Sequence, residues 1–208
     1  MNILRLLVAV TLLGVSSIAA ADPQSYTNLE FSLGKQGAIF LDGGTSYRLS
    51  GNYDLSDTFY AYGQYSSNTF GGFSGSSSGL DAKQTVFGFG LGMHSAVADA
   101  TDWVVRFGLN RNKAESAVSN SSHTGYDLGT GLNTAIATGL ELSTFIDHTT
   151  ASTDATTGLP SNISASASET VLSAGLHTQI GKSMDFGVTE EFSNIGQNRL
   201  LLSLRWDF

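Results

Sequence analysis

The sequence predicts an all-β protein, a closed antiparallel up-and-down β-barrel that spans the outer membrane of a Gram-negative bacterium. Three observations predict it: an N-terminal segment typical of an export signal, apolar residues that alternate with polar ones, and a last alternating stretch that ends in an aromatic residue. A sheet edge exposed to hydrocarbon would leave its backbone polar groups without partners, so a lipid-facing sheet must close on itself.

The N-terminal segment predicts a cleaved signal peptide over residues 1–21. Arg5 precedes the apolar run Leu6–Val15, which is too short to cross a bilayer as a helix, and the small residues Ala19–Ala21 offer a cleavage site. An N-terminal anchor helix is the alternative, but no stop-transfer pattern supports it. We therefore assign residues 22–208 to a single barrel domain.

The composition of the chain limits the kinds of partner that it can bind. Charged residues make up only 13% of the chain and aromatic residues 10%, which suits a barrel whose lipid contacts fall on alternate residues. The chain has no cysteine, so neither disulfides nor thiolate metal sites are expected. A net charge of −8 disfavours binding to nucleic-acid phosphates. We expect no cofactor, no metal, no nucleic acid, and a monomer in contact with outer-membrane lipid and lipopolysaccharide.

The period-two pattern is clearest at the C-terminus, where Leu200, Leu202, Leu204, Trp206 and Phe208 would share one face. It recurs at Tyr47–Tyr53, Phe87–Met93 and Trp103–Leu109. In the third strand both faces could contact lipid, and we place Gln64 inside. Candidate strands, each about as long as a tilted transmembrane strand needs, lie near residues 26–36, 44–53, 58–67, 83–94, 101–112, 123–133, 139–148, 169–180, 184–193 and 198–208.

These ten strands, an even number, would leave both termini in the periplasm, with Tyr26–Lys35 paired to Arg199–Phe208. Eight strands remain the alternative, if the first hairpin or the Met184–Phe192 strand does not span the membrane. Expected short turns are Asp54–Asp57, Ser95–Ala100, Thr134–Thr138 and Gly181–Ser183, and expected longer loops are Ser67–Ala82, Asn112–Ser122 and Thr149–Ser168. Such asymmetry predicts periplasmic turns and extracellular loops.

Two resemblances add to this picture. The C-terminal strand, with Trp206 and the terminal Phe208, resembles the signature that the outer-membrane assembly machinery reads, which implies that machinery as a partner. Ser25–Glu30, Leu55–Ser66 and Phe87–Met93 resemble segments of the xanthomonad outer-membrane barrel family once proposed as a secreted quorum or immunity signal. That resemblance implies an outer-membrane barrel without a catalytic motif.

Seven charged residues are expected on the inner face of the barrel. We favour a lumenal ion-pair network, which would satisfy buried charges, over a pore lining whose mixed signs would give weak ion preference. Such a barrel would be narrow and mostly filled by side chains, with room for water and small solutes at best. The seven residues are Glu30, Arg48, Arg106, Asp127, Glu141, Arg199 and Arg205.

A second candidate site is a histidine pair at the outer rim. If the hairpin turns near Ile136, His123 lies opposite His148, beside Asp147, where the group could activate water or bind a transition metal. We favour two exposed loop-edge histidines with no such role.

Gly88, Gly90 and Gly92 recur at period two without the strand and helix context of a phosphate loop, so we expect them to leave room inside the barrel. Three functions remain open: first a structural or surface-interaction barrel, then a narrow channel for ions or small solutes, and last a rim-site hydrolase.

Overall fold

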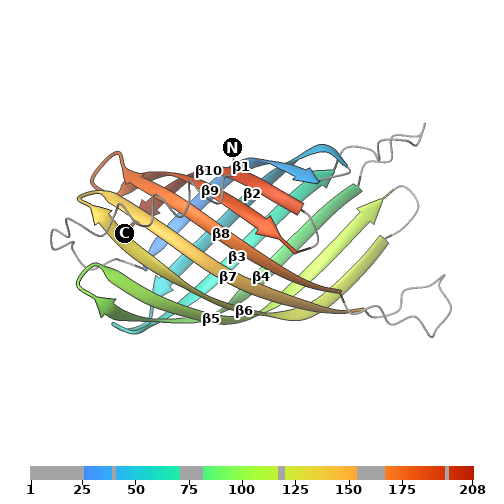
Figure 1. The fold of residues 1–208 in the computed structure, drawn as a ribbon. Coiled ribbons are helices and arrows are strands. Elements are labelled where there is room, and N and C mark those ends of the chain that lie inside the picture. Colours follow the sequence, from blue (N-terminus) through green and yellow to red (C-terminus); the bar gives the residue numbers. More distant parts are fainter. Residues whose placement is uncertain (1–25, 39–40, 71–81, 117–119, 154–166, 195–196) are drawn as a thin grey trace.

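The computed structural model describes residues 26–38, 41–70, 82–116, 120–153, 167–194 and 197–208. Its strands follow one another in chain order around a closed antiparallel barrel and tilt relative to its axis (Figure 1). The strands are β1 (Asn28–Ala38), β2 (Leu41–Asp54), β3 (Phe59–Phe70), β4 (Ala82–Ala98), β5 (Thr101–Ser116), β6 (Asn120–Ala137), β7 (Leu140–Thr153), β8 (Ala167–Gln179), β9 (Met184–Ser193) and β10 (Gln197–Asp207). Within these residues, no helix is long and apolar enough to cross a membrane.

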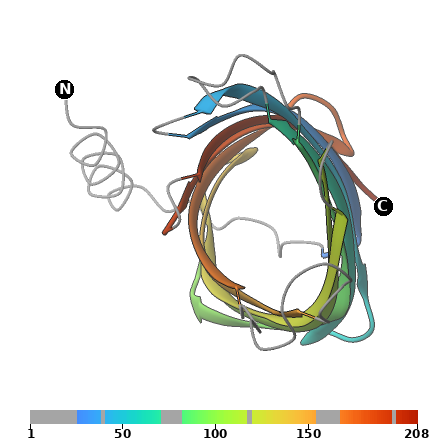
Figure 2. The ribbon, with the colours of Figure 1, turned by 90° about the vertical axis from the view of Figure 1, so that its right-hand side faces the viewer.

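The barrel closes between β1 and β10, as predicted. The pairing runs from Asn28 opposite Asp207 to Ala38 opposite Gln197. Beyond it, the Phe208 amide donates a hydrogen bond of 3.1 Å to the Thr27 carbonyl. Viewed from the end, the strands form a complete ring around a lumen (Figure 2). The ten-stranded prediction is confirmed and the eight-stranded alternative is wrong.

Side chains alternate between the two faces of the wall as the period-two pattern predicts. Leu200 is 51% exposed, whereas its neighbour Leu201, which faces the lumen, is 2% exposed. In β3, Tyr60 and Gln64 face inward. The outward apolar residues form what we call the apolar belt. Its members are Leu29, Phe31, Leu33, Tyr47, Leu49, Tyr53, Phe59, Tyr65, Phe87, Phe89, Leu91, Trp103, Phe107, Leu109, Tyr126, Leu128, Leu132, Ile146, Leu172, Leu176, Phe186, Val188, Leu200, Leu202 and Trp206.

The apolar belt indicates that lipid, rather than water, surrounds the outer wall of the barrel. A soluble monomer rarely exposes an apolar patch larger than a few hundred Å². A continuous belt of aromatic and aliphatic side chains around a closed barrel is instead the outer surface that hydrocarbon requires.

The strands extend further than the sequence pattern indicated. Residues 112–122 were expected to form a loop, but β5 continues to Ser116 and β6 begins at Asn120, with Lys113 opposite Ser122. Alternation fades here because both faces become polar, yet backbone pairing needs no apolar face. In the same way β3 reaches Phe70 and β7 reaches Thr153. The remaining residues of the two other expected loops, 71–81 and 154–166, lie outside the described residues, as does the expected signal peptide.

The hairpin between β6 and β7 turns later than predicted. Residues 134–138 were expected as the turn, but β6 reaches Ala137 and the turn is Thr138–Gly139. Gly139 has φ of 69°, a left-handed conformation that glycine adopts without steric cost and that suits a two-residue hairpin turn. This placement fixes the register of the hairpin, with Leu128 opposite His148.

Candidate functional site in the barrel lumen

The lumen contains a polar cavity of about 280 Å³. Its lining extends from Tyr26, Asn133 and Arg205 near the short-turn end of the barrel to Asn68 and Gln84 near the opposite, loop end. A water occupies about 30 Å³ in the liquid, so this cavity has room for on the order of ten waters. The interior is therefore narrow but not packed solid.

All seven charged residues that the sequence places inside line this cavity. The structure adds three carboxylates that sequence reasoning did not place there, namely Asp147, Glu169 and Glu191. The charged lining therefore consists of Glu30, Asp127, Glu141, Asp147, Glu169 and Glu191 against Arg48, Arg106, Arg199 and Arg205. Among the residues that the structure describes, carboxylates outnumber guanidiniums by six to four, so this lining is acidic rather than balanced.

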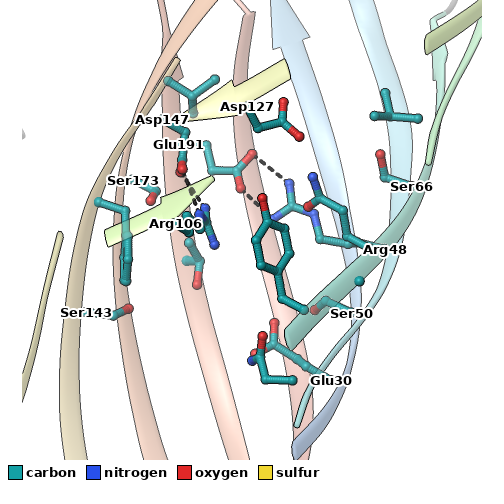
Figure 3. Close-up of a pocket in the computed structure, with 18 of the residues that line it drawn as sticks. Glu30, Arg48, Ser50, Ser66, Arg106, Asp127, Ser143, Asp147, Ser173 and Glu191 are labelled. Carbon is teal, nitrogen blue, oxygen red and sulfur yellow. Dashed lines mark hydrogen bonds and ion pairs between the residues drawn. The ribbon is translucent and has the colours of Figure 1, made fainter. Parts of the chain in front are cut away.

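One ion-pair network crosses the lumen. Arg48 of β2 contacts Glu191 of β9 at 2.7 Å, although β1 and β10 separate these strands in the wall (Figure 3). On the β10 side, Arg199 approaches Glu191 and Glu169 at 3.3 Å each. Glu191 is 5% exposed, so this carboxylate depends on its two guanidiniums for charge compensation.

A second network joins β5 to β7. Arg106 donates two hydrogen bonds to Asp147, of 2.8 Å from Nε and 2.6 Å from Nη2, in a bidentate arrangement (Figure 3). Its guanidinium also lies 5.0 Å from the ring centroid of Phe145 and 6.0 Å from that of Tyr62. The fork geometry and the aromatic faces hold this arginine against the wall of the lumen.

A third network lies near the short-turn end. Arg205 of β10 contacts Asp185 at 2.6 Å, Glu141 at 3.0 Å and Asp207 at 3.4 Å. One guanidinium thus compensates three carboxylates from β7, β9 and its own strand. The arrangement ties these strands together at this end of the barrel.

Two carboxylates in the lining, Glu30 and Asp127, are not in direct contact with a cation that the structure describes. No arginine or lysine among the described residues forms an ion pair with Glu30 or Asp127. Asp127 Oδ1 accepts hydrogen bonds from Asn110 at 2.7 Å and Thr149 at 2.9 Å. Its Oδ2 atom is buried and has no hydrogen-bond partner among the described residues. Glu30 Oε1 accepts a hydrogen bond of 2.9 Å from the Ser32 hydroxyl, so both carboxylates are held by neutral donors rather than by contact with a cation.

A group that we call the Tyr26 stack narrows the cavity near the short-turn end. The Tyr26 ring stacks on His94 at 4.1 Å and on Tyr60 at 5.1 Å between centroids. Its hydroxyl donates to Asp102 at 3.2 Å and accepts from Asn133 at 3.3 Å. Tyr26 precedes β1, whereas its hydroxyl partners belong to β5 and β6, so the side chain reaches across the lumen.

The inward glycines make room for tyrosine rings. A Cβ atom on Gly92 would overlap the ring of Tyr60, and one on Gly108 would overlap the Tyr62 hydroxyl. The expectation that Gly88, Gly90 and Gly92 leave space inside the barrel is therefore confirmed, because side chains from neighbouring strands occupy that space.

The histidine pair at the outer rim does not form. In the observed register Thr153, not His148, lies opposite His123, because the hairpin turns two residues later than predicted. His123 shares the inward parity of Asp127, whereas His148 points outward and lies 2.9 Å from the Thr170 hydroxyl. Asp147 is held by Arg106 inside the lumen. The candidate rim site is therefore wrong as a geometric arrangement. The favoured interpretation, two exposed loop-edge histidines, is wrong as well, because both side chains are half-buried on β6 and β7.

Comparisons with known proteins support the fold class. The translocator domain of the autotransporter NalP from Neisseria meningitidis has a TM-score of 0.56 at 11% identity, with 98% of this chain and 94% of that one covered. The transport unit of the autotransporter AIDA-I from Escherichia coli has a TM-score of 0.53 at 10% identity, with 97% of each chain covered. The NanC porin has a TM-score of 0.52 at 7% identity, with coverage of 86% and 100%.

No family model and no curated protein matches the chain. At such low identities the structural likeness shows the fold alone. Together with the apolar belt, it makes this protein an outer-membrane β-barrel.

Proposed function

We propose that this protein is a narrow, water-filled channel for small solutes that prefers cations. The observation that carries the proposal is the polar cavity, whose lining extends from Tyr26 at the short-turn end to Asn68 at the loop end. A hydrated path of that extent is what a narrow pore requires, and a lumen filled by apolar side chains would lack it.

The preference for cations follows from the lining. Among the described residues, six carboxylates and four guanidiniums line the cavity, and Glu30 and Asp127 form no ion pair. Rings and clusters of carboxylates favour cations in pores, and walls of low dielectric constant strengthen their field. The net charge of −8 on the whole chain acts in the same direction.

The Tyr26 stack supports a small conductance, because it lies across the path near the short-turn end. The test is single-channel recording in planar bilayers with the wild type and Tyr26→Ala. We expect small, reproducible openings for the wild type and a severalfold larger conductance for the variant. Tyr53→Ala is the matched control, since Tyr53 lies at the same end but on the lipid side, 64% exposed.

Two results would contradict the proposal. One is the absence of reproducible openings in both the wild type and Tyr26→Ala, when both show the heat-dependent gel shift of a folded barrel. The other is an equal change in conductance for Tyr26→Ala and Tyr53→Ala, which would remove the stack from the conduction path.

A second candidate function is a structural or surface-interaction role for a barrel whose lumen does not conduct. The Arg48–Glu191 contact across the lumen favours it. Cross-links of this kind stiffen a barrel and reduce its free cross-section. Under this alternative neither the wild type nor Tyr26→Ala would conduct.

A further inference from the structure

A cluster of basic side chains lies on the outer wall of the barrel, just beyond the apolar belt at the loop end. Lys83 of β4 and Arg111 and Lys113 of β5 are all exposed. They have the outward parity of Phe87 and Leu109, which belong to the belt. We call these three residues the basic cluster.

The register of β4 and β5 brings the basic cluster together. Arg111 lies opposite Phe87, Lys113 opposite Thr85, and Lys83 opposite Glu115. Lys83 is thus the diagonal neighbour of Lys113, and diagonal positions on one face are about 7–8 Å apart. Arg111 and Lys113 are next-but-one neighbours on the same strand. The three cations can therefore approach one multiply charged group.

One carboxylate competes with an incoming anion. Lys113 forms an ion pair with Glu115, whose side chain is 38% exposed. The hydrogen bond from Lys113, together with its positive charge, lowers the pKa of the Glu115 carboxyl, which therefore stays ionised at neutral pH. The surface that contains these four residues still carries two net positive charges, in a chain whose total is −8.

Position and charge together identify an occupant. Side chains just past the edge of a hydrocarbon belt meet lipid headgroups, and basic clusters there attract anionic headgroups. The loop end of an outer-membrane barrel faces the outer leaflet. We propose that the basic cluster binds the phosphate groups of an anionic outer-leaflet lipid of the lipopolysaccharide class. The site is independent of conduction through the lumen.

The test measures binding of lipid A to the purified full-length barrel in a neutral detergent, by native mass spectrometry or by titration. The test variant combines Lys83→Gln, Arg111→Gln and Lys113→Gln. Since a basic residue near an anionic surface contributes on the order of 1 kcal/mol, binding should weaken on the order of a hundredfold. Lys182→Gln, which removes an exposed lysine at the short-turn end, is the matched control and should bind as the wild type does.

Two further arms make the test specific. Glu115→Gln removes the competing carboxylate and should tighten binding severalfold. Enzymatically dephosphorylated lipid A should bind the wild type and the triple variant equally and weakly. Three results would each overturn the proposal: unchanged lipid A affinity in the triple variant, weaker binding by Glu115→Gln, or a wild type that binds dephosphorylated lipid A as tightly as it binds lipid A itself. The heat-dependent gel shift verifies that every variant is folded.

Discussion

Replacing Arg205 by methionine tests the ion-pair networks of the lumen. Its guanidinium contacts Glu141, Asp185 and Asp207, whose side chains are 15%, 9% and 28% exposed. The substitution keeps most of the side-chain volume but leaves three neighbouring carboxylates uncompensated. Breaking a buried ion pair typically costs about 3–5 kcal/mol. Because the cavity can hold water and Asp207 is more exposed than the other two carboxylates, we expect a loss near the lower end of this range, about 3 kcal/mol.

The assay is urea unfolding of the barrel in lipid vesicles, followed by gel mobility and tryptophan fluorescence. Lys182→Met is the matched control, because Lys182 is exposed at the short-turn end and its loss should change the free energy of unfolding by about 0.5 kcal/mol at most. Lowering the pH enough to protonate carboxylates should narrow the difference between the two variants. Equal stability of Arg205→Met and Lys182→Met at neutral pH would refute the reasoning.

Two further predictions concern the walls of the barrel. Gly92→Val should lower the free energy of unfolding by about 1–3 kcal/mol, because its Cβ would overlap the ring of Tyr60. Gly63→Val should cost little, because a Cβ there would make only an ordinary contact of 3.9 Å with the Gly88 carbonyl oxygen; urea midpoints compare the two variants. Leu91→Lys should cost about 2–4 kcal/mol within the apolar belt and Thr85→Lys, at its edge, about 0–1 kcal/mol; equal costs in vesicles would contradict a lipid-facing belt.

Strand number, closure and facing could be predicted from the sequence because lipid on one side and a polar lumen on the other impose a strict period of two. The pattern at Leu200–Phe208 is sufficient to assign both faces of β10. The ends of the strands could not be predicted, because beyond the belt both faces are polar. Lys113 and Ser122 pair through their backbones with no alternation to mark them.

Only some of the residues that line the lumen could be predicted, and the reason again lies in the alternation of polar and apolar residues. A single charged residue between two apolar ones, such as Arg48 or Arg106, can be assigned to the inner face from the sequence. In the adjacent pair Glu190 and Glu191 the sequence does not show which carboxylate points inward. The Tyr26 stack depends on contacts across the ring of strands, which no local pattern encodes.

The rim histidines show how sensitive a site prediction is to register. Moving the turn from Ile136 to Thr138–Gly139 separated His123 from His148 along the strands. Their odd and even positions then place them on opposite faces of the wall.

The reversal potential of the wild-type protein in a planar bilayer with a potassium chloride gradient tests the central claim most directly. An acidic, hydrated lumen predicts a reversal potential displaced toward the equilibrium potential of potassium, and a smaller displacement in Asp127→Asn. A reversal potential at zero or displaced toward that of chloride would contradict a cation-preferring channel, and a membrane that contains folded protein yet carries no current would contradict the channel itself.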